Sequence, residues 1–311
     1  MDLDLGAVRA FVAVAGDRSF SAAADRLGLS QQAVSKRVAR LEAGLGVTLL
    51  ARTRGGAAPT AEGRAFLVPA RALLVLADQA VEQARGGPRP LRVDVLGTRL
   101  ASTRLVRGFH EARPDVEIEI LTSDGLATAA PALLAGALDA FLGRAATGLD
   151  EGIRHAPAYL EPLHVLVGRG HRLADHEHVR AVELAGTTAW MPGNARESEW
   201  VEFYRFLSAD LGIGTDPSGP NFGLEHYVER IATSDTRYGI VGEDIPLPPH
   251  PDIRRLPIVE PTPVFPWSLM WHAQNRHPAL APLIEHVTAG SRPFDPSAEW
   301  LPPPDRAAFS G

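Results

Sequence analysis

The stretch SFSAAADRLGLSQQAVSKRVARLEAGLG, residues 19–46, constrains the fold more than any other part of the 311-residue chain. Here and just upstream, apolar residues recur every three or four positions, which is the spacing of amphipathic helices. Ser21 and Ser30 are placed to cap the second and third helices, and Gly28 suits the left-handed turn that ends the second. Three short helices joined by such tight turns form a helix-turn-helix unit. The predicted inward positions are Ala7, Phe11, Val14, Ala23, Ala24, Leu27, Val34, Val38, Leu41 and Leu45.

The outer face of the third helix carries amides, a hydroxyl group and cations, rather than the mixture of Glu and Lys usual on a solvated helix. Glutamine can pair with adenine, and Lys or Arg can reach guanine or phosphate. The first turns of such a helix are the part that meets base edges. This face consists of Gln32, Ser35, Lys36, Ala39 and Arg40, with Gln31 and Arg37 at its margins. The DNA contacts predicted from the helices are its polar and charged members, together with Ser21 and Ser30. The alternative is an ordinary solvated surface helix.

The distribution of charge favours DNA recognition over that alternative. Residues 1–90 hold 12 Lys and Arg against 8 Asp and Glu, although the whole chain has a net charge of -6. A basic head on an acidic body is typical of a protein that binds a polyanion through the head. No secretory signal is recognisable and no apolar stretch reaches membrane-spanning length, so we expect a cytoplasmic protein without a membrane partner.

The segment VTLLARTRGGAAPT, residues 47–60, predicts a wing made of two short strands around Gly55 and Gly56. Arg52 and Arg54 lie on this wing, where their cations can contact phosphate or enter the minor groove. The alternative is a solvated turn that carries two arginines.

Residues 60–85 predict one long helix, capped by Thr60 and kinked by Pro69. Its apolar residues form a continuous stripe at helical spacing. The stripe could pack on its own domain, but the head already has a complete small core, which favours a second copy of the helix as its partner. The predicted dimerisation residues are Phe66, Ala70, Leu73, Leu74, Ala77 and Val81.

Residues 3–85 resemble the winged helix-turn-helix and linker helix of LysR-type transcriptional regulators. The resemblance is carried by LGAVRAFVAVAGDRSFSAAADRLGLSQQAVSKRVARLEAGLGVTLLART and by PTAEGRAFL. Two residues depart from the family pattern: Gln32 stands where proline is frequent, and Leu50 where phenylalanine is frequent. The resemblance implies a dimer formed through the 60–85 helix, with dimers pairing into tetramers, and a two-lobed effector domain like a periplasmic binding protein.

Beyond the linker RGGPRP, residues 85–90, strand-like and helix-like segments alternate, which predicts an α/β fold with mainly parallel sheets. Helices are expected near 102–112, 126–135, 197–207, 224–233 and 279–289. The chain should cross between the two lobes near 158–163 and 255–264. The predicted domains are a winged helix-turn-helix at 1–59, a linker helix and hinge at 60–90, an effector domain at 91–290 (lobe I about 91–160 and 262–290, lobe II about 161–261), and a poorly ordered proline-rich tail at 291–311.

In open α/β sheets, ligands lie at the carboxyl ends of strands and against helix N-termini. Segments in these positions therefore supply the candidate effector-binding residues, of which we expect about half to contact a small molecule. They are Thr98, Arg99, Ser102, Ser123, Asp124, Arg144, Met191, Asn194, Asn221 and Phe222. The two arginines favour an anionic effector, whereas Thr98 and Ser102 are also residues that cap helices.

The sequence offers no motif for catalysis, cofactor binding or metal binding. It contains no cysteine, which excludes disulfides, thiolate metal sites and cysteine nucleophiles. His171, His176 and His178 occur in a polar segment, but their spacing suits no common metal site. No nucleophile elbow or nucleotide-binding glycine loop is present.

The resulting hypothesis is a transcriptional regulator that binds a double-stranded DNA operator and responds to a small-molecule effector held between its lobes. It would act as a homodimer or dimer of dimers, and would contact RNA polymerase if it is an activator. The alternative is a solute-binding or enzymatic α/β body whose N-terminal helices serve only for oligomerisation. Salt-dependent binding to duplex DNA separates these hypotheses.

Overall fold

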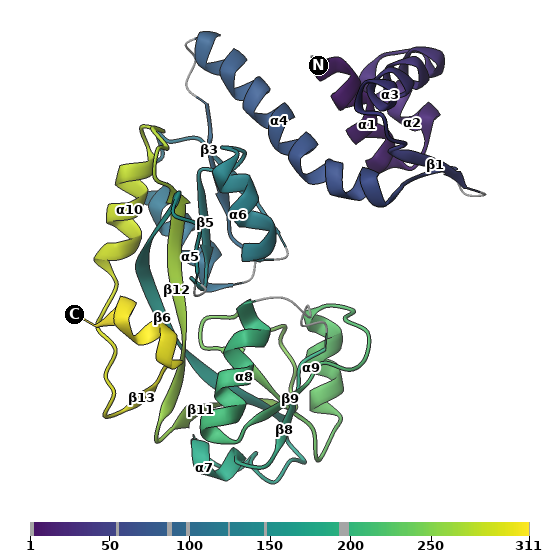
Figure 1. Cartoon of the computed structure of the whole chain (residues 1–311). Helices are drawn as coiled ribbons and strands as arrows, with labels where there is room; N and C mark the ends of the chain where they lie inside the picture. Colours follow the sequence, from purple (N-terminus) through teal and green to yellow (C-terminus); the bar gives the residue numbers. More distant parts are fainter. Residues whose placement is uncertain are drawn as a thin grey trace. The chain divides into compact units, whose positions relative to one another are not determined.

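The computed structural model describes residues 3–53, 56–85, 89–97, 100–123, 125–145, 148–192 and 199–310 (Figure 1), with backbone alone for some residues within 52–56 and 68–85. The chain divides into two compact units. One comprises residues 1–89, called the head below, and the other the greater part of residues 90–311, called the body. Within the described ranges, no helix combines the length and apolarity needed to cross a membrane.

The head is built from α1 (Leu5–Asp17), α2 (Phe20–Leu27) and α3 (Gln31–Leu45), followed by the antiparallel strands β1 (Leu50–Thr53) and β2 (Gly56–Pro59). Ser30 caps α3 as predicted, since its Oγ accepts a hydrogen bond of 3.2 Å from the amide of Ala33. Gly28 ends α2 with a φ of 64°. The prediction that Ser21 caps α2 is wrong: the helix starts earlier, and Ser19 accepts from the amide of Ala22.

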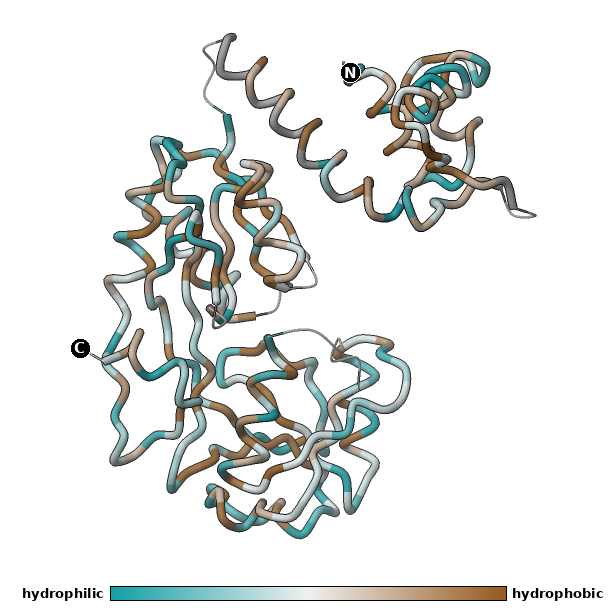
Figure 2. Tube along the Cα trace, viewed as in Figure 1, coloured by the Kyte–Doolittle hydropathy of each residue, from teal (hydrophilic) through white to brown (hydrophobic). Residues whose placement is uncertain are grey.

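The three helices enclose one hydrophobic core, and the wing is tied to it. Phe11, Val34 and Val38 are almost wholly buried in this core. Glu42, the acidic residue of α3, accepts from the amides of Leu49 and Leu50, at 2.7 and 3.0 Å. The carboxylate therefore fixes the start of the wing to the helix that precedes it. Figure 2 shows hydrophobic and hydrophilic residues alternating along the head helices.

Helix α4 (Ala61–Arg85) begins against the wing and continues through Pro69. Thr60 caps it as predicted, since its Oγ1 accepts from the amide of Gly63 at 2.9 Å. Only glycine fits at position 63, because a Cβ atom there would lie 2.0 Å from the carbonyl oxygen of Leu49.

The first turns of α4 pack on the core of their own head, which corrects part of the dimerisation prediction. Ala70 is 0% exposed and Leu74 is 7% exposed within a single chain. Phe66 and Leu73 pack against the same core, and the ring of Phe66 lies 5.7 Å from that of Phe11. Because the first apolar turns of α4 are buried in their own head, only the later part of the stripe is left for a partner. Val81 is 49% exposed.

The central sheet of the body has the strand order β4-β3-β5-β12-β6-β11-β7, and it is mixed rather than mainly parallel. The strands β3 (Leu91–Asp94), β4 (Ile118–Leu121) and β5 (Ala140–Gly143) are parallel to one another. The long strand β12 (Thr262–His272) runs antiparallel to β5 and β6. The prediction missed this arrangement because it treated the long crossing segments as connections.

Strand β6 (Ile153–Gly168) is shared by both lobes. As far as Pro162 it pairs with β12, and beyond that with β10 (Tyr238–Gly242) and β11 (Ile253–Val259). The second passage between lobes lies where β11 ends and β12 begins. Both passages fall inside the segments 158–163 and 255–264 named from the sequence.

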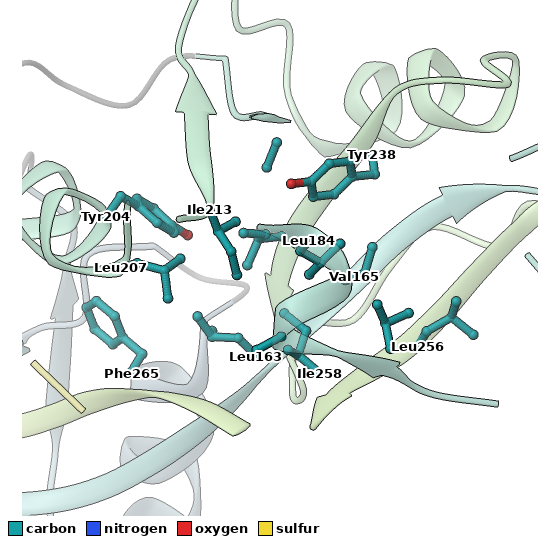
Figure 3. Close-up of a cluster of buried hydrophobic side chains, with 14 of the residues drawn as sticks. Leu163, Val165, Leu184, Tyr204, Leu207, Ile213, Tyr238, Leu256, Ile258 and Phe265 are labelled. Carbon is teal, nitrogen blue, oxygen red and sulfur yellow. The ribbon is translucent and has the colours of Figure 1, made fainter. Parts of the chain in front are cut away.

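Each lobe has helices packed around its part of the sheet. The first lobe contains α5 (Ala101–Ala112), α6 (Leu126–Leu134) and α10 (Leu280–Ala289). The second contains β7 (Val179–Arg180), α7 (Ala181–Leu184), β8 (Thr188–Trp190), α8 (Glu199–Leu211), β9 (Gly214–Asp216) and α9 (Leu224–Ala232). Figure 3 shows the core of the second lobe, where side chains such as Leu163, Leu207 and Ile258 meet.

The C-terminal tail is ordered, contrary to the prediction from its proline content. It forms β13 (Glu299–Trp300), which pairs with the start of β12, and the 3-10 helix η1 (Pro303–Phe309). Leu301 is 0% exposed and packs with residues of β6 and β12. The tail carries enough apolar surface to bury, and this outweighs the bias of its prolines towards disorder.

Candidate functional site

The face of α3 predicted to contact DNA is exposed to solvent along its length, while Val34, Val38 and Leu41 are buried on the opposite side. The core and the Glu42 contact hold the helix rigidly beneath this face. Its exposed members are Gln31, Gln32, Ser35, Lys36, Arg37 and Arg40. Among the described residues, no hydrogen bond or ion pair engages Gln32, Ser35, Lys36 or Arg40. The face therefore offers amide donors and acceptors, a hydroxyl group and cations to a partner.

The two serines in the predicted DNA-binding set have different local roles. Ser30 is exposed, and its hydroxyl oxygen is already used to cap α3. Ser21 lies on α2, where its Oγ donates a hydrogen bond of 3.3 Å to Oε1 of Gln31. Ser21 thus links α2 to the first residue of α3 and orients the amide of Gln31.

The arginines of the wing are only partly described. The backbone of Arg52 lies in β1, paired with Ala57 of β2, but its side chain is outside the described atoms. Arg54 lies outside the described residues.

Four predicted effector residues also lie outside the described residues: Thr98, Arg99, Asp124 and Asn194. Ser102 is described, and it is 0% exposed. Its Oγ donates to the carbonyl oxygen of Val95 at 2.5 Å. It therefore neither caps α5, whose N-cap residue is Leu100, nor offers its hydroxyl group to a ligand. Its role is to fasten α5 to the end of β3.

Arg144 was expected to offer a cation to an effector, and this expectation is wrong. Its side chain is 0% exposed and forms ion pairs with Asp305 of the tail, at 2.9 Å, and Glu202 of α8, at 2.6 Å. Its Nη1 also donates to the main-chain oxygen of Glu199 at 3.4 Å. Since the three contacts come from the second lobe and the tail, Arg144 connects these parts to the first lobe. Burial raises the pKa of Asp305, and the guanidinium group opposes this rise.

The other predicted effector residues differ in accessibility. Ser123 is partly exposed, and its Oγ accepts from the amide of Gly125 at 3.3 Å. The sulfur atom of Met191 accepts from the hydroxyl group of Tyr227 at 3.4 Å, so this side chain packs inside the second lobe. Asn221 and Phe222 precede α9 and are exposed, Phe222 to 71%.

One surface pocket of the first lobe has a volume of about 420 Å³ and is lined by residues 148–151 and 153–155. None of the predicted effector residues lines it.

Within the histidine segment, His171 has a structural role. His171 is 7% exposed, its Nδ1 accepts from the amide of Leu173, and burial lowers its pKa. The described residues contain no group of three or more histidines and carboxylates arranged to hold a metal ion.

Glu161 and Glu199 are two of the buried carboxyl groups of the body that sequence reasoning missed. Glu161 lies on β6 next to the passage between lobes, is 1% exposed, and accepts from Nε1 of Trp267 at 2.7 Å. Burial raises its pKa to about 7. Glu199 starts α8 and is 6% exposed. Its Oε2 accepts from the amide of Leu126, the first residue of α6, at 3.3 Å, and burial raises its pKa. Nothing local in the sequence distinguishes either from an ordinary surface glutamate.

Comparison with known families supports both units. The profile of bacterial regulatory helix-turn-helix proteins of the lysR family matches residues 5–64, which include α1 to α3 and the wing. The profile of the LysR substrate binding domain matches residues 85–221 of the body.

Two curated relatives illustrate the similarity. The chain is 35% identical over 193 residues to the uncharacterized HTH-type transcriptional regulator YnfL of Escherichia coli (strain K12), a match that covers 60% of this chain and 64% of YnfL. It is 34% identical over 230 residues to the small neutral protease regulatory protein of Streptomyces coelicolor (strain ATCC BAA-471 / A3(2) / M145), covering 70% of this chain and 67% of that protein. The match thus spans less than two thirds of YnfL, and only 60% and 61% of two further relatives.

Among solved structures, CbnR, a LysR family transcriptional regulator, superposes with a TM-score of 0.72 at 26% sequence identity. The match covers 92% of this chain and 99% of CbnR, so it includes both the head and the body. With family profiles matching in each unit and a relative of 34% identity matched over two thirds of its length, the chain belongs to the LysR family of bacterial helix-turn-helix regulatory proteins.

Proposed function

We propose that the protein is a sequence-specific DNA-binding transcriptional regulator controlled by a small-molecule effector bound in the body. The observation that carries this proposal is the exposed face of α3, where Gln32, Lys36 and Arg40 stand on a rigid helical core. A helix of this kind fits the major groove of B-DNA and reads base edges through its first turns. In support, the related CbnR has been solved in complex with its target DNA.

The contacts to DNA divide into two kinds. Gln31, Gln32 and Ser35 lie on the first turns of α3, where side chains reach base edges or the adjacent phosphates. Lys36, Arg37 and Arg40 add cations for guanine or phosphate, and Ser21 and Ser30 lie beside them. Arg52 and Arg54 of the wing contact the backbone or the minor groove, which positions the head without reading sequence.

The active form is a homodimer that binds an operator with two-fold symmetry, and two dimers pair into a tetramer. The interface includes the later part of α4, from Ala77 to Val81, because the earlier turns are buried in the head. Contact with RNA polymerase follows if the protein activates its target genes.

The body binds its effector between the two lobes, close to the start of α5 and α6. The N-terminal amides of such helices suit an anion or a carbonyl group. At α6 the amide of Leu126 is bonded to the carboxyl group of Glu199. The proposed contacts are Ser123, which is partly exposed, Asn221 and Phe222, together with Thr98, Arg99, Asp124 and Asn194 from outside the described residues. Binding shifts the balance between two lobe arrangements, which changes the spacing of the heads on DNA.

The test is duplex binding by the full chain. Genomic fragments retained by the protein are sequenced, and the enriched site is compared with an unrelated duplex by fluorescence anisotropy at several salt concentrations. A regulator binds its site more tightly by about a thousandfold or more, and the logarithm of its affinity falls linearly with the logarithm of salt concentration. Absence of duplex binding at low salt would favour the alternative, in which the head serves only for oligomerisation.

A further inference from the structure

Glu199 of the second lobe inserts its side chain into the first lobe. Its Oε2 accepts a hydrogen bond of 3.3 Å from the amide of Leu126, the first residue of α6. Glu199 is 6% exposed, and within the described part of the chain its buried Oε1 has no hydrogen-bond partner. The first amides of a helix have no partner within the helix, so here the other lobe supplies one.

The place that receives the carboxyl group is shaped to fit it. Gly125 has a φ of 109°, and a Cβ atom at this position would lie 2.3 Å from Oε2 of Glu199. A Cβ atom on Gly143, at the end of β5, would lie 2.5 Å from the ring of Phe141 and 3.1 Å from Oε1 of Glu199. The amide of Gly125 bonds to Ser123, and that of Leu126 bonds to Glu199. The space left by the two glycines beside the α6 amide is called the carboxylate seat below.

The carboxyl group of Glu199 is only partly hydrogen-bonded in this seat. The guanidinium group of Arg144 contacts the main-chain oxygen of Glu199, and its ion pairs go to Glu202 and Asp305 instead of the Glu199 carboxyl group. Burial raises the pKa of Glu199, and the nearby carboxyl group of Asp94 adds to this rise. Hydrogen bonds from main-chain amides and the charge of Arg144 oppose it. A buried acceptor without a hydrogen-bond partner destabilises the folded arrangement, and this penalty disappears when the acceptor is exposed to water. The contact between lobes is therefore one that can open.

We propose that Glu199 is an internal latch: it fills a carboxylate-binding seat at the start of α6, holds the two lobes together, and is displaced by an effector that carries a carboxylate. This inference rests on the proposed role of the body as an effector domain. The Glu199 carboxyl group thus occupies the position that the carboxylate of the effector would take. Displacement gives the seat to the effector and returns Glu199 to solvent, which frees α8 from α6.

Acetate is the probe, because Glu199→Ala removes a carboxylate with one methylene group attached, which is close to acetate in size. The full-length variant is expected to melt about 2–4 °C below the wild type in chloride. Sodium acetate should restore at least half of that loss in a saturable way, compared with sodium chloride at equal ionic strength. The wild type should not respond, because its seat is full.

Three further variants sharpen the test. Glu199→Gln keeps an acceptor oxygen for Leu126 and should be insensitive to acetate. Glu285→Ala removes an exposed glutamate from α10 and controls for general effects of the salt. If Glu199→Ala does not fold, Glu199→Asp, whose shorter arm withdraws from the seat, should gain the acetate response instead. Equal stabilisation of the wild type and the Glu199 variants, or none in any of them, would overturn the latch.

The same samples separate this inference from the proposed function. Duplex binding measured by anisotropy tests the head, and the acetate response tests the body. Duplex binding without an acetate response would contradict the proposed latch and would support the proposed regulator. An acetate response without duplex binding would support the carboxylate seat and would contradict the proposed regulator.

Discussion

On the outer face of α3, Lys36 and Arg40 are exposed to solvent, whereas in the body Arg144, Glu161 and Glu199 are at least nine-tenths buried. An exposed charge keeps its hydration until a partner arrives, so it contributes little to the stability of its own fold. A buried charge must find its partners within the chain, because an isolated charge in the interior is very costly. Substitutions on α3 should therefore change binding, and substitutions in the body should change stability.

The largest expected effect comes from Arg144→Ala. This change leaves the buried Asp305 and the partly buried Glu202 without their cation, which should cost about 3–5 kcal/mol of unfolding free energy. Urea unfolding followed by tryptophan fluorescence measures it. Arg40→Ala is the matched control, since the same residue type is lost from an exposed site. Equal unfolding midpoints for the two variants would remove the contrast between the regions.

The second prediction is that the early part of α4 stabilises the head and the later part forms the dimer interface. Leu74→Glu places a charge in the core of the head and should lower its stability by about 2–5 kcal/mol. Val81→Glu changes a residue that is 49% exposed in one chain, so it should leave the fold intact and dissociate the dimer. Circular dichroism measures the first effect and light scattering the second. A Val81→Glu protein of unchanged mass would exclude this part of α4 from the interface.

The contrast between the regions also explains what the sequence could predict. Ser30, Gly28 and Thr60 act on residues within three or four positions of themselves, so their roles followed from spacing. The error at Ser21 has the same local character, because two serines stand close together and the cap depends on where α2 begins.

The body was predictable in its elements but less so in its polar contacts. Arg144 bonds to Asp305, which is 161 positions away, and Glu199 bonds to Leu126 across 73 positions. Such partners depend on how the lobes and the tail fold together, and no periodicity in the sequence records this. The tail illustrates the same limit: its prolines favour disorder, whereas the burial of Trp300 and Leu301 orders it.

The third prediction concerns pH. Glu161 has a pKa of about 7 in the fold, raised by burial and partly offset by the hydrogen bond from Trp267, against an ordinary value of 4.5. The folded protein therefore holds this proton more tightly than the unfolded chain does, so its stability should fall as pH rises from about 4.5 to 7 and then level off. At about 1.4 kcal/mol per unit of pKa, the loss is at most about 3.5 kcal/mol.

Glu161→Gln removes this titration and should flatten the dependence of stability on pH over that interval. Urea unfolding at a series of pH values measures it, with the exposed Glu285→Gln as control. An unchanged profile in Glu161→Gln would mean that the carboxyl group titrates normally in the fold.

The exposed face of α3 as a reader of DNA sequence is the central claim, and Gln32→Ala tests it most directly. Anisotropy is measured on the selected operator and on an unrelated duplex, with Gln274→Ala, an exposed glutamine of the body, as control. We expect Gln32→Ala to weaken operator binding by about 1–3 kcal/mol, to weaken binding to the unrelated duplex much less, and to leave the melting temperature unchanged. Equal losses on both duplexes, or no loss on either, would contradict the claim.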